Sequence, residues 1–269
     1  MTSEERQYAL FGRPVAHSLS PAMHNGAYRE MSLRARYRAF AVETAAEIPP
    51  VMDREDIRGA SVTLPHKEAV LEWLDGMSAP CRSIGAANTI VRKKGGLYGE
   101  NTDWSGFVLS LRERLEIRQR VFAVIGAGGA ARAAVYGILD EGGIPVVLNR
   151  SAARGRALAD RFGCSFLPLE EIGRVEAPVL VNATSVGITA PGGDWPFTEK
   201  VLSRFPWVMD MVYTPLRTAL LEDAERAGCR VIPGYPMFVY QGAEQIRLWT
   251  GLKPPVERMM EIVLERLSP

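Results

Sequence analysis

An apolar segment that runs directly into a glycine-rich loop constrains the fold of this chain more than any other feature. Residues 121–125 are Val-Phe-Ala-Val-Ile, and Gly126-Ala-Gly-Gly-Ala-Ala follows at once. Gly126, Gly128 and Ala131 match the spacing G-x-G-x-x-G/A, in which the first glycine makes a tight turn and the second lets a pyrophosphate approach the backbone. The spacing predicts a strand–loop–helix unit whose helix N-terminus offers N–H groups and a positive dipole end to phosphates.

Strands and helices alternate after this loop. Short apolar runs, typical of parallel strands covered on both faces, lie at 121–125, 145–148, 178–182, 207–211 and 230–232. Helical patterns lie between them at 130–139, 151–162 and 215–227. Gly163 and Gly228 follow the last two patterns, as expected because glycine accepts the left-handed conformation that ends many helices. The alternation predicts a Rossmann-type, doubly wound parallel sheet.

The first hundred residues show the same α/β character. We expect strands near 8–11, 37–41 and 60–64, helices starting at Pro21 and Pro65, and a hairpin at 90–98. At the other end of the chain, apolar residues recur at helical spacing from Val256 to Leu267, which predicts a packing surface. Two α/β domains joined near Asp103 and Trp104 are the simplest layout.

Composition excludes several classes of function. The chain has 269 residues, 47% of them hydrophobic and 23% charged, as in soluble globular proteins. Its net charge of +1 gives no reason to expect nucleic acid or a membrane as partner. The three cysteines have no metal-binding or CxxC spacing, and the polar N-terminus does not resemble a signal peptide. We therefore expect a cytoplasmic protein.

Two serines before the first predicted helix form a candidate anion site. Ser20 precedes Pro21, so we expect Ser20 to cap the helix. A second interpretation is that Ser18 and Ser20 add hydroxyl groups to the helix N-terminus and receive a substrate carboxylate. We interpret His17 and His24 as structural hydrogen-bonding groups, because no third metal ligand accompanies them at useful spacing.

Three further polar residues are predicted to lie at strand ends. Lys67 falls in the first turn of the helix expected from Pro65, where the helix dipole disfavours a cation. It is either a solvated lysine or a general acid/base. Asp103 either caps the next helix or holds the Lys67 ammonium group. Asn88 also lies where a strand and a turn meet, and this edge of an open α/β sheet is the usual place for ligands.

The end of the second strand in the nucleotide-binding half favours NADP(H) over NAD. A site for NAD usually places an acidic residue there to bind the ribose 2′-hydroxyl. This chain has Asn149-Arg150-Ser151 instead, followed by Arg154. Guanidinium groups pair with phosphate oxygens in two parallel hydrogen bonds, so the two arginines suit a 2′-phosphate.

Taken together, the motifs resemble the shikimate dehydrogenase family over nearly the whole chain. They are HSLSP at 17–21, SVTLPHK at 61–67, GAANT at 85–89, NTD at 101–103, GAGGAA at 126–131, NR at 149–150, NATSVG at 182–187, DMVY at 210–213, Gly234, Met237, QG at 241–242 and WTG at 249–251. The resemblance implies reversible reduction of 3-dehydroshikimate to shikimate with NADPH, in the pathway to aromatic amino acids. It also implies that residues 1–103, completed by helices within 237–269, bind the substrate, and that 104–236 bind NADP.

The resemblance assigns roles to individual residues. Lys67 and Asp103 would be the catalytic acid–base pair. The substrate carboxylate would bind Ser18, Ser20 and Tyr213, and the ring hydroxyls would bind Thr63, Asn88 and Gln241. The cofactor would bind Gly126, Ala127, Gly128, Gly129, Ala130, Asn149, Arg150, Arg154, Thr184, Ser185, Met211, Gly234 and Met237. Small molecules would be the only ligands, and the chain would act as a monomer or homodimer.

Some positions depart from the family pattern, and two other functions remain open. Ser61 stands where the family usually has asparagine, Ala87 where it has valine, and Phe238 where it has leucine; the region 48–56 is also short. Ser61 lies beside the expected hydroxyl pocket and could alter affinity or substrate range. The alternatives are a quinate/shikimate dehydrogenase of relaxed specificity and a non-catalytic NADPH-binding regulator.

Overall fold

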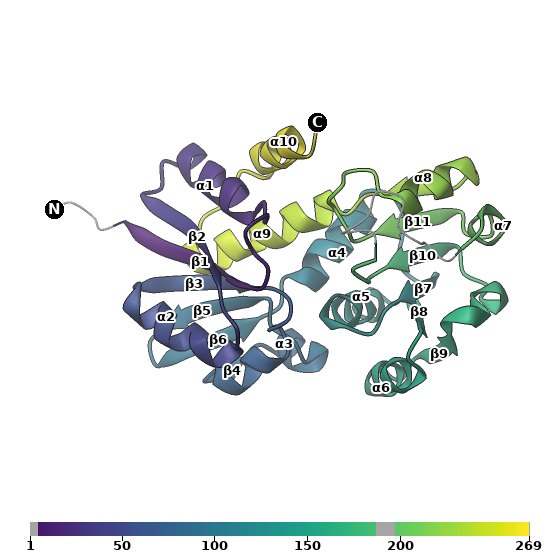
Figure 1. Ribbon diagram of the computed structural model, residues 1–269, viewed down its shortest axis with the longest axis horizontal. Coiled ribbons are helices and arrows are strands. Elements are labelled where there is room, and N and C mark those ends of the chain that lie inside the picture. Colours follow the sequence, from purple (N-terminus) through teal and green to yellow (C-terminus); the bar gives the residue numbers. More distant parts are fainter. Residues whose placement is uncertain (1–4, 187–196, 269) are drawn as a thin grey trace. The chain divides into compact units, whose positions relative to one another are not determined.

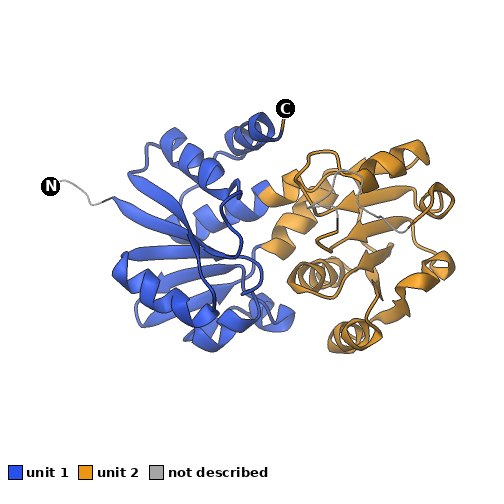
Figure 2. Cartoon of the chain, viewed as in Figure 1, with its two compact units in different colours: residues 1–102, 239–267, 269 blue, residues 103–238, 268 orange. Residues whose placement is uncertain are grey.

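The computed structural model describes residues 5–186 and 197–268. Two compact units make up the chain (Figure 2). Unit 1 contains the residues up to Thr102 together with Val239–Leu267, and unit 2 contains Asp103–Phe238. Within the described residues, no helix is long and apolar enough to cross a membrane.

Unit 1 is built on a mixed sheet with the strand order β2-β1-β3-β5-β6-β4. The strands are β1 (Arg6–Gly12), β2 (Ala35–Ala41), β3 (Ile57–Val62), β4 (Gly76–Met77), β5 (Thr89–Lys93) and β6 (Gly96–Glu100). The helices are α1 (Ser20–Glu30), α2 (Ile48–Arg54), α3 (Ala79–Ile84), α10 (Val256–Leu267) and two 3-10 turns at Ala45–Glu47 and Ala69–Trp73. β1 pairs in parallel with β2 and β3, whereas β5 runs antiparallel to β3 and β6. β5 and β6 form the predicted hairpin (Figure 1).

Alternating side chains of β1 bury both faces of this sheet. Ala9 and Phe11 pack in one cluster with Ile48 and Met52 of α2. Tyr8 points to the opposite face, where its ring contacts those of Tyr28 on α1 and Trp249 on α9 (Tyr235–Thr250). Such alternation is the period of two that a strand imposes on its side chains.

Close packing of α9 on the sheet depends on a glycine in β3. A Cβ atom at Gly59 would lie 2.3 Å from the Trp249 ring, so only glycine leaves room for that ring. The Trp249 indole N–H also donates to the carbonyl oxygen of Ile90 on β5, at 3.0 Å. α9 is therefore held against β3 and β5, and residues on its inner face reach the polar groups of these strands.

Unit 2 is the predicted doubly wound sheet, and all of its strands are parallel. The strand order is β12-β11-β10-β7-β8-β9. The strands are β7 (Val121–Ile125), β8 (Ile144–Asn149), β9 (Ser165–Pro168), β10 (Val179–Asn182), β11 (Trp207–Asp210) and β12 (Arg230–Ile232). The helices are α4 (Asp103–Arg112), α5 (Gly129–Asp140), α6 (Ala152–Phe162), a 3-10 turn at Leu169–Arg174, α7 (Glu199–Leu202) and α8 (Ala219–Arg226).

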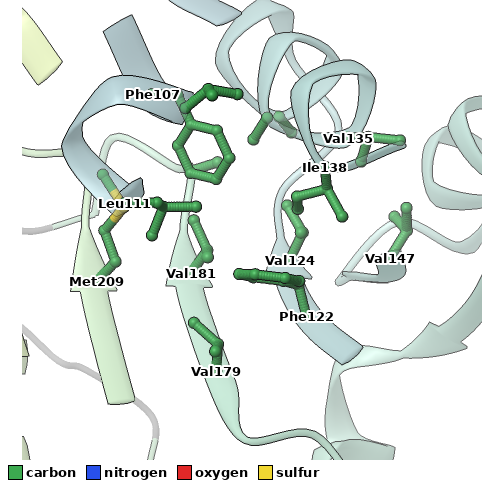
Figure 3. Packing of buried hydrophobic residues seen from close by; sticks show 14 of the residues in the cluster. Phe107, Leu111, Phe122, Val124, Val135, Ile138, Val147, Val179, Val181 and Met209 are labelled. Atoms are coloured by element: carbon green, nitrogen blue, oxygen red, sulfur yellow. The ribbon is translucent and has the colours of Figure 1, made fainter. Parts of the chain in front are cut away.

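Apolar side chains from α4, α5, α6 and five of these strands form the core on one face of this sheet (Figure 3). Phe107 and Leu111 of α4 pack with Phe122 and Val124 of β7, all four of them fully buried or nearly so. Such strands need apolar residues at consecutive positions because helices cover both faces of the sheet. That requirement explains why apolar runs predicted five of the six strands. β9, whose residues are only half-buried or exposed, was not predicted.

Two helix predictions need correction. No α-helix starts at Pro65: the backbone turns there and continues into the 3-10 turn Ala69–Trp73. The carbonyl oxygens of Leu64 and Lys67 accept hydrogen bonds from the distant N–H groups of Arg13 and Ala87, at 2.9 and 2.8 Å, instead of from a following turn of helix. Lys67 is thus held in a loop, and the helix-dipole argument made from the sequence does not apply to it.

The second correction concerns the helix expected at 215–227. The observed helix, α8, begins only at Ala219 because Thr218 caps it, with its side chain accepting a hydrogen bond from the N–H of Leu221. The Thr218 hydroxyl also donates to Asp210, at 2.6 Å. This tie to the end of β11 keeps residues 215–218 outside the helix.

Candidate active site

One edge of the unit 1 sheet collects the polar segments that the sequence singled out. Along the sheet, Leu10 pairs with Ser61, Ser61 with Thr89, and Thr89 with Glu100. These pairs place the C-terminal ends of β1, β3 and β6 beside the start of the antiparallel strand β5. Segments leaving or entering these strands therefore meet at this edge, where ligand sites of open α/β sheets are usually found.

The candidate residues of unit 1 follow from this register. Ser18 and Ser20 come after β1, Thr63 and Lys67 after β3, and Asn88 directly before β5. Thr102 follows β6, and Asp103 is the next residue along the chain. Thr63 and Lys67 are half-buried, Asn88 and Asp103 are buried, and Gln241 of α9 is half-buried.

At the start of α1, the capping serine differs from the prediction. Ser20 is the first residue of the helix, and Leu19 occupies the capping position without a side-chain hydrogen bond. The hydroxyl that meets the first turn belongs to Ser18, whose Oγ accepts from the Ser20 N–H at 3.2 Å. Ser18 is half-buried and Ser20 is buried. The two serines thus lie together at the helix N-terminus, although the capping interaction belongs to Ser18.

His24 is part of the core rather than of a metal site. Its side chain is fully buried and its Nδ1 pairs with the Ser20 carbonyl oxygen at 2.9 Å. Its ring stacks on Tyr37, with ring centres 4.1 Å apart. His17 is exposed. Among residues 5–186 and 197–268, no group of three or more His, Cys, Asp and Glu side chains could hold a metal ion.

Burial makes His24 a source of acid sensitivity. Loss of hydration lowers the pKa of His24 from 6.5 to about 4, against the opposing effect of its bond to Ser20. The unfolded chain therefore binds a proton at higher pH than the folded chain does, so stability is lost as pH falls from 6.5 towards 4. We expect His24 to remove about 2 kcal/mol of unfolding free energy between pH 7 and pH 4.5.

A variant can isolate this contribution in urea denaturation at the two pH values. His24→Phe keeps an aromatic ring against Tyr37 but cannot titrate, so the fall in unfolding free energy from pH 7 to pH 4.5 should be about 2 kcal/mol smaller than in the unmodified chain. The comparison between the two proteins cancels other titrating groups. An equal fall in both proteins would show that His24 is not buried in its neutral form.

Asn88 ties the end of β6 to the start of β5. Its Oδ1 accepts from the Thr102 backbone N–H at 2.7 Å, and its Nδ2 donates to the Thr102 hydroxyl at 2.9 Å. Nδ2 also lies 3.4 Å from Oε1 of Gln241. The residue directly before Asp103 is thus fixed by a buried amide. Lys67 belongs to unit 1 and Asp103 begins unit 2, and the pairing of their charges stays a prediction.

In unit 2, the loop between β7 and α5 excludes a side chain at one glycine and leaves open space at another. Gly126 has a φ of 122°, and a Cβ atom there would lie 2.9 Å from the carbonyl oxygen of Ala183. A side chain is therefore excluded on both conformational and steric grounds. Gly128 caps α5, and a Cβ atom there would meet nothing within 4 Å. The loop leaves open space beside the N-terminus of a twelve-residue helix, which fits a bound phosphate group.

The end of β8 carries exposed positive charge. Asn149 is its last residue, and its Nδ2 donates to the carbonyl oxygen of Ser151 at 2.8 Å. Ser151 caps α6 by accepting from the N–H of Arg154. Arg150 and Arg154 are both exposed. Residues 149–154 include no acidic residue that could bind a ribose 2′-hydroxyl. The two arginines therefore fit the 2′-phosphate of NADP rather than the ribose hydroxyl of NAD.

A buried carboxylate that the sequence analysis missed holds the ends of β10 and β11. Asp210 accepts hydrogen bonds from Asn182 Nδ2, the Val212 N–H and the Thr218 hydroxyl, at 2.9, 3.0 and 2.6 Å. Asn182 Oδ1 in turn accepts from the Thr184 hydroxyl, at 2.7 Å. Burial raises the pKa of Asp210 to about 6. An aspartate at the end of an otherwise apolar strand, before Met211, was the available signal in the sequence.

Of the remaining cofactor candidates, Ser185 and Met211 follow β10 and β11, Gly234 lies between β12 and α9, and Met237 lies in α9. A Cβ atom at Gly234 would lie 2.6 Å from the carbonyl oxygen of Met211, so a glycine is needed for the two loops to approach. Met237 is buried in the core of unit 2, and Ser185 is exposed. Residue 187 of the NATSVG motif lies outside the described residues.

Tyr213 lies against Phe238, one of the departures from the family pattern. Their rings stack with centres 4.2 Å apart and planes inclined by 20°. Burial raises the pKa of Tyr213 to about 12. The phenol therefore stays protonated near neutral pH and can donate a hydrogen bond.

Comparison with protein families finds two matching models. Residues 10–90 match the shikimate dehydrogenase substrate binding domain, and residues 234–264 match the shikimate 5′-dehydrogenase C-terminal domain. Among curated relatives, the shikimate dehydrogenase (NADP+) of Pyrococcus abyssi is 43% identical over 97% of this chain and 98% of its own length. That of Thermococcus kodakarensis is 42% identical over 99% of this chain and 98% of its own length.

Solved structures agree with these matches. A shikimate dehydrogenase in complex with NADP+ superposes with a TM-score of 0.91 at 31% identity, covering 98% of this chain and 96% of its own. The Thermus thermophilus enzyme in complex with NADP(H) and shikimate gives 0.88 at 39% identity, covering 97% and 99%. A 5-ketofructose reductase of Gluconobacter gives 0.87 at 28% identity, covering 98% and 99%, so proteins named for different substrates share this architecture.

Proposed function

The chain belongs to the shikimate dehydrogenase family, and on that premise we propose that Lys67 and Asp103 carry the acid–base step of its reaction. The protein is an NADP-dependent oxidoreductase that acts on a CH–OH group. It interconverts 3-dehydroshikimate and shikimate in aromatic amino acid biosynthesis. The observation that supports the proposal most strongly is the sheet edge of unit 1, where Lys67, Asn88 and Thr102 follow from the register of β3, β5 and β6.

Substrate recognition is assigned to groups that match a hydroxylated ring acid. Ser18 and Ser20, at the N-terminus of α1, suit the carboxylate, and the protonated phenol of Tyr213 adds a donor for it. Thr63, Asn88 and Gln241 suit the ring hydroxyl groups. In this proposal residues 1–103 and 237–269 serve the substrate, and residues 104–236 serve the cofactor.

Proton transfer is assigned to Lys67. In the direction of reduction, its ammonium group donates a proton to the carbonyl oxygen as that oxygen becomes a hydroxyl; in the reverse direction, its amine removes the hydroxyl proton. The Asp103 carboxylate orients the ammonium group and offsets its charge. When bound, NADPH supplies the hydride.

Cofactor binding is assigned to the carboxyl edge of the unit 2 sheet. The backbone of Gly126, Ala127, Gly128, Gly129 and Ala130 holds the pyrophosphate, and Arg150 and Arg154, with Asn149, hold the 2′-phosphate. Thr184, Ser185, Met211, Gly234 and Met237 border the nicotinamide. The Asp210–Asn182 pair supports this border, because it fixes the loops that carry Thr184 and Met211.

A steady-state assay tests substrate and cofactor together. Purified protein should reduce NADP+ with shikimate at alkaline pH, and kcat/KM should be lower with NAD+ or with quinate. Two acids must be compared because a 5-ketofructose reductase shares this fold, so the fold alone does not fix the substrate. Comparable kcat/KM on quinate would indicate relaxed specificity. Cofactor binding without turnover on either acid would indicate a regulator and would refute the proposal. We expect the enzyme to act in the cytoplasm, as a monomer or homodimer.

A further inference from the structure

A continuous chain of buried hydrogen bonds crosses unit 1 and ends at the residue before Asp103. It begins at the Tyr37 hydroxyl on β2, which donates to Ser61 Oγ on β3 at 2.6 Å. Ser61 Oγ donates to Gln245 Oε1 on α9 at 2.8 Å, and Gln245 Nε2 donates to Thr89 Oγ1 on β5 at 3.0 Å. Tyr37, Ser61, Gln245 and Thr89 are all buried.

The last links of the chain reach the candidate site. Thr89 Oγ1 donates to Asn88 Oδ1 at 2.8 Å. The same Oδ1 accepts from the backbone N–H of Thr102, at 2.7 Å, and Asn88 Nδ2 donates to the Thr102 hydroxyl, at 2.9 Å. The chain therefore orients the Asn88 amide and holds the segment from which α4 begins with Asp103.

Two backbone groups fix the direction of every bond in the chain. A backbone carbonyl can only accept, and Gln245 Nε2 lies 3.3 Å from that of Asn88, so the Gln245 oxygen must face Ser61. Ser61 must then donate to Gln245, which leaves its lone pairs for the Tyr37 hydroxyl. At the other end, the Thr102 backbone N–H can only donate, so Asn88 must present its oxygen there. Thr89, which accepts from Gln245, must donate to that same oxygen.

We propose that Ser61 is a positioning residue for the dehydrogenase reaction: its hydroxyl orients Gln245, and through Thr89 it sets the Asn88 amide and the segment that leads to Asp103. The inference rests on the proposed roles of Asn88 and Asp103. Only a side chain that both accepts and donates can serve at this point of the chain. Alanine at position 61 would leave the Gln245 oxygen and the Tyr37 hydroxyl buried without this partner, and the Gln245 amide could then rotate.

We expect substitution of Ser61 to lower kcat/KM for shikimate and to leave KM for NADP+ nearly unchanged. Ser61→Ala should lower kcat/KM for shikimate about tenfold, in line with the loss of a buried hydrogen bond. Its KM for NADP+ should stay close to that of the unmodified enzyme. Ser61→Thr, which keeps the hydroxyl, should restore most of the loss. A purely structural role would reduce the amount of active enzyme and leave both KM values unchanged.

Thr89→Val provides an independent break in the same chain. Ser61 and Thr89 are cross-strand partners, and valine matches threonine in shape but cannot relay a hydrogen bond. We expect the same kinetic signature from Thr89→Val, and a Ser61→Ala/Thr89→Val double variant should lose little more than either single variant, because both cut one chain. Ser110→Ala is the matched control, since the equally buried Ser110 hydroxyl donates to the Phe107 carbonyl oxygen of its own helix, in unit 2.

The possible outcomes distinguish failure of the role proposed for Ser61 from failure of the proposed function. Unchanged kcat/KM for shikimate in Ser61→Ala, or in Thr89→Val if Ser61→Ala does not fold, would overturn the inference while the unmodified enzyme remains active. Fully additive losses in the double variant would also overturn it. Absence of shikimate-dependent turnover in the unmodified enzyme would instead refute the proposed function.

Discussion

Lys67→Ala is expected to lower kcat for shikimate oxidation by about two to four orders of magnitude, the usual contribution of a positioned general acid or base. Binding of NADPH should stay nearly unchanged, because the residues assigned to the cofactor lie at the sheet edge of unit 2 and Lys67 lies in unit 1. Steady-state kinetics and direct titration of NADPH measure the two effects separately.

A surface lysine provides the control for this experiment. Lys94 lies exposed in the turn between β5 and β6, so Lys94→Ala should leave kcat and NADPH binding unaltered. If Lys67→Ala lost turnover and cofactor binding to the same extent, the substitution would have damaged the fold. If it kept most of its turnover, Lys67 would not be the acid–base group.

The second large effect is expected at the end of β8. Replacing both Arg150 and Arg154 by alanine should weaken NADP+ binding by about two orders of magnitude or more, because each arginine is assigned a charge-assisted hydrogen bond to the 2′-phosphate. Binding of NAD+, which has no such phosphate, should hardly change. Isothermal titration with both dinucleotides gives the ratio of affinities directly.

The helix that carries Arg154 offers a matched substitution. Arg161 is exposed in the last turn of α6, one helix length from the strand end, and Arg161→Ala should not alter the ratio of affinities. Parallel losses of NADP+ and NAD+ affinity in the Arg150→Ala/Arg154→Ala variant would mean that these arginines do not recognise the 2′-phosphate.

Local patterns were sufficient to predict most of unit 2. Its strands are buried on both faces, so they appear as apolar runs, and Gly163 ends α6 with a φ of 64° as expected from its position. The loop at Gly126 could be predicted because only glycine satisfies both its positive φ and its close contact with Ala183. The burial of a strand and the positive φ of a glycine belong to one strand or one position, so a local pattern can indicate them.

Predictions failed where individual hydrogen bonds, which the residue pattern does not reveal, decide where a helix begins. Pro65 suggested a helix start, but bonds from Arg13 and Ala87 hold the neighbouring carbonyl oxygens in a loop. Pro215 suggested another, but the bond from Thr218 to Asp210 delays α8. Ser20 was predicted to be the capping residue, but the cap is one residue earlier, at Leu19. The hydroxyl that accepts a hydrogen bond from the first helical N–H belongs to Ser18.

The candidate site was predictable in its residue types but not in its support. Serine, lysine, asparagine and aspartate at strand ends could be recognised one motif at a time. The Ser61–Gln245 bond joins residues 184 positions apart, and neither residue carries a local signal for the other. Asp210 likewise reveals its role only through Asn182 and Thr218, which contact it from other elements.

The central claim is that this chain oxidises shikimate with NADP+ and uses Lys67 to move the proton. The most direct test is the initial rate of NADP+ reduction at alkaline pH, measured with and without shikimate on the unmodified protein and on Lys67→Ala side by side. The account predicts a rate that requires shikimate, scales with enzyme concentration and falls at least about a hundredfold in the variant. No shikimate-dependent rate in the unmodified protein, or equal rates in the two proteins, would contradict it.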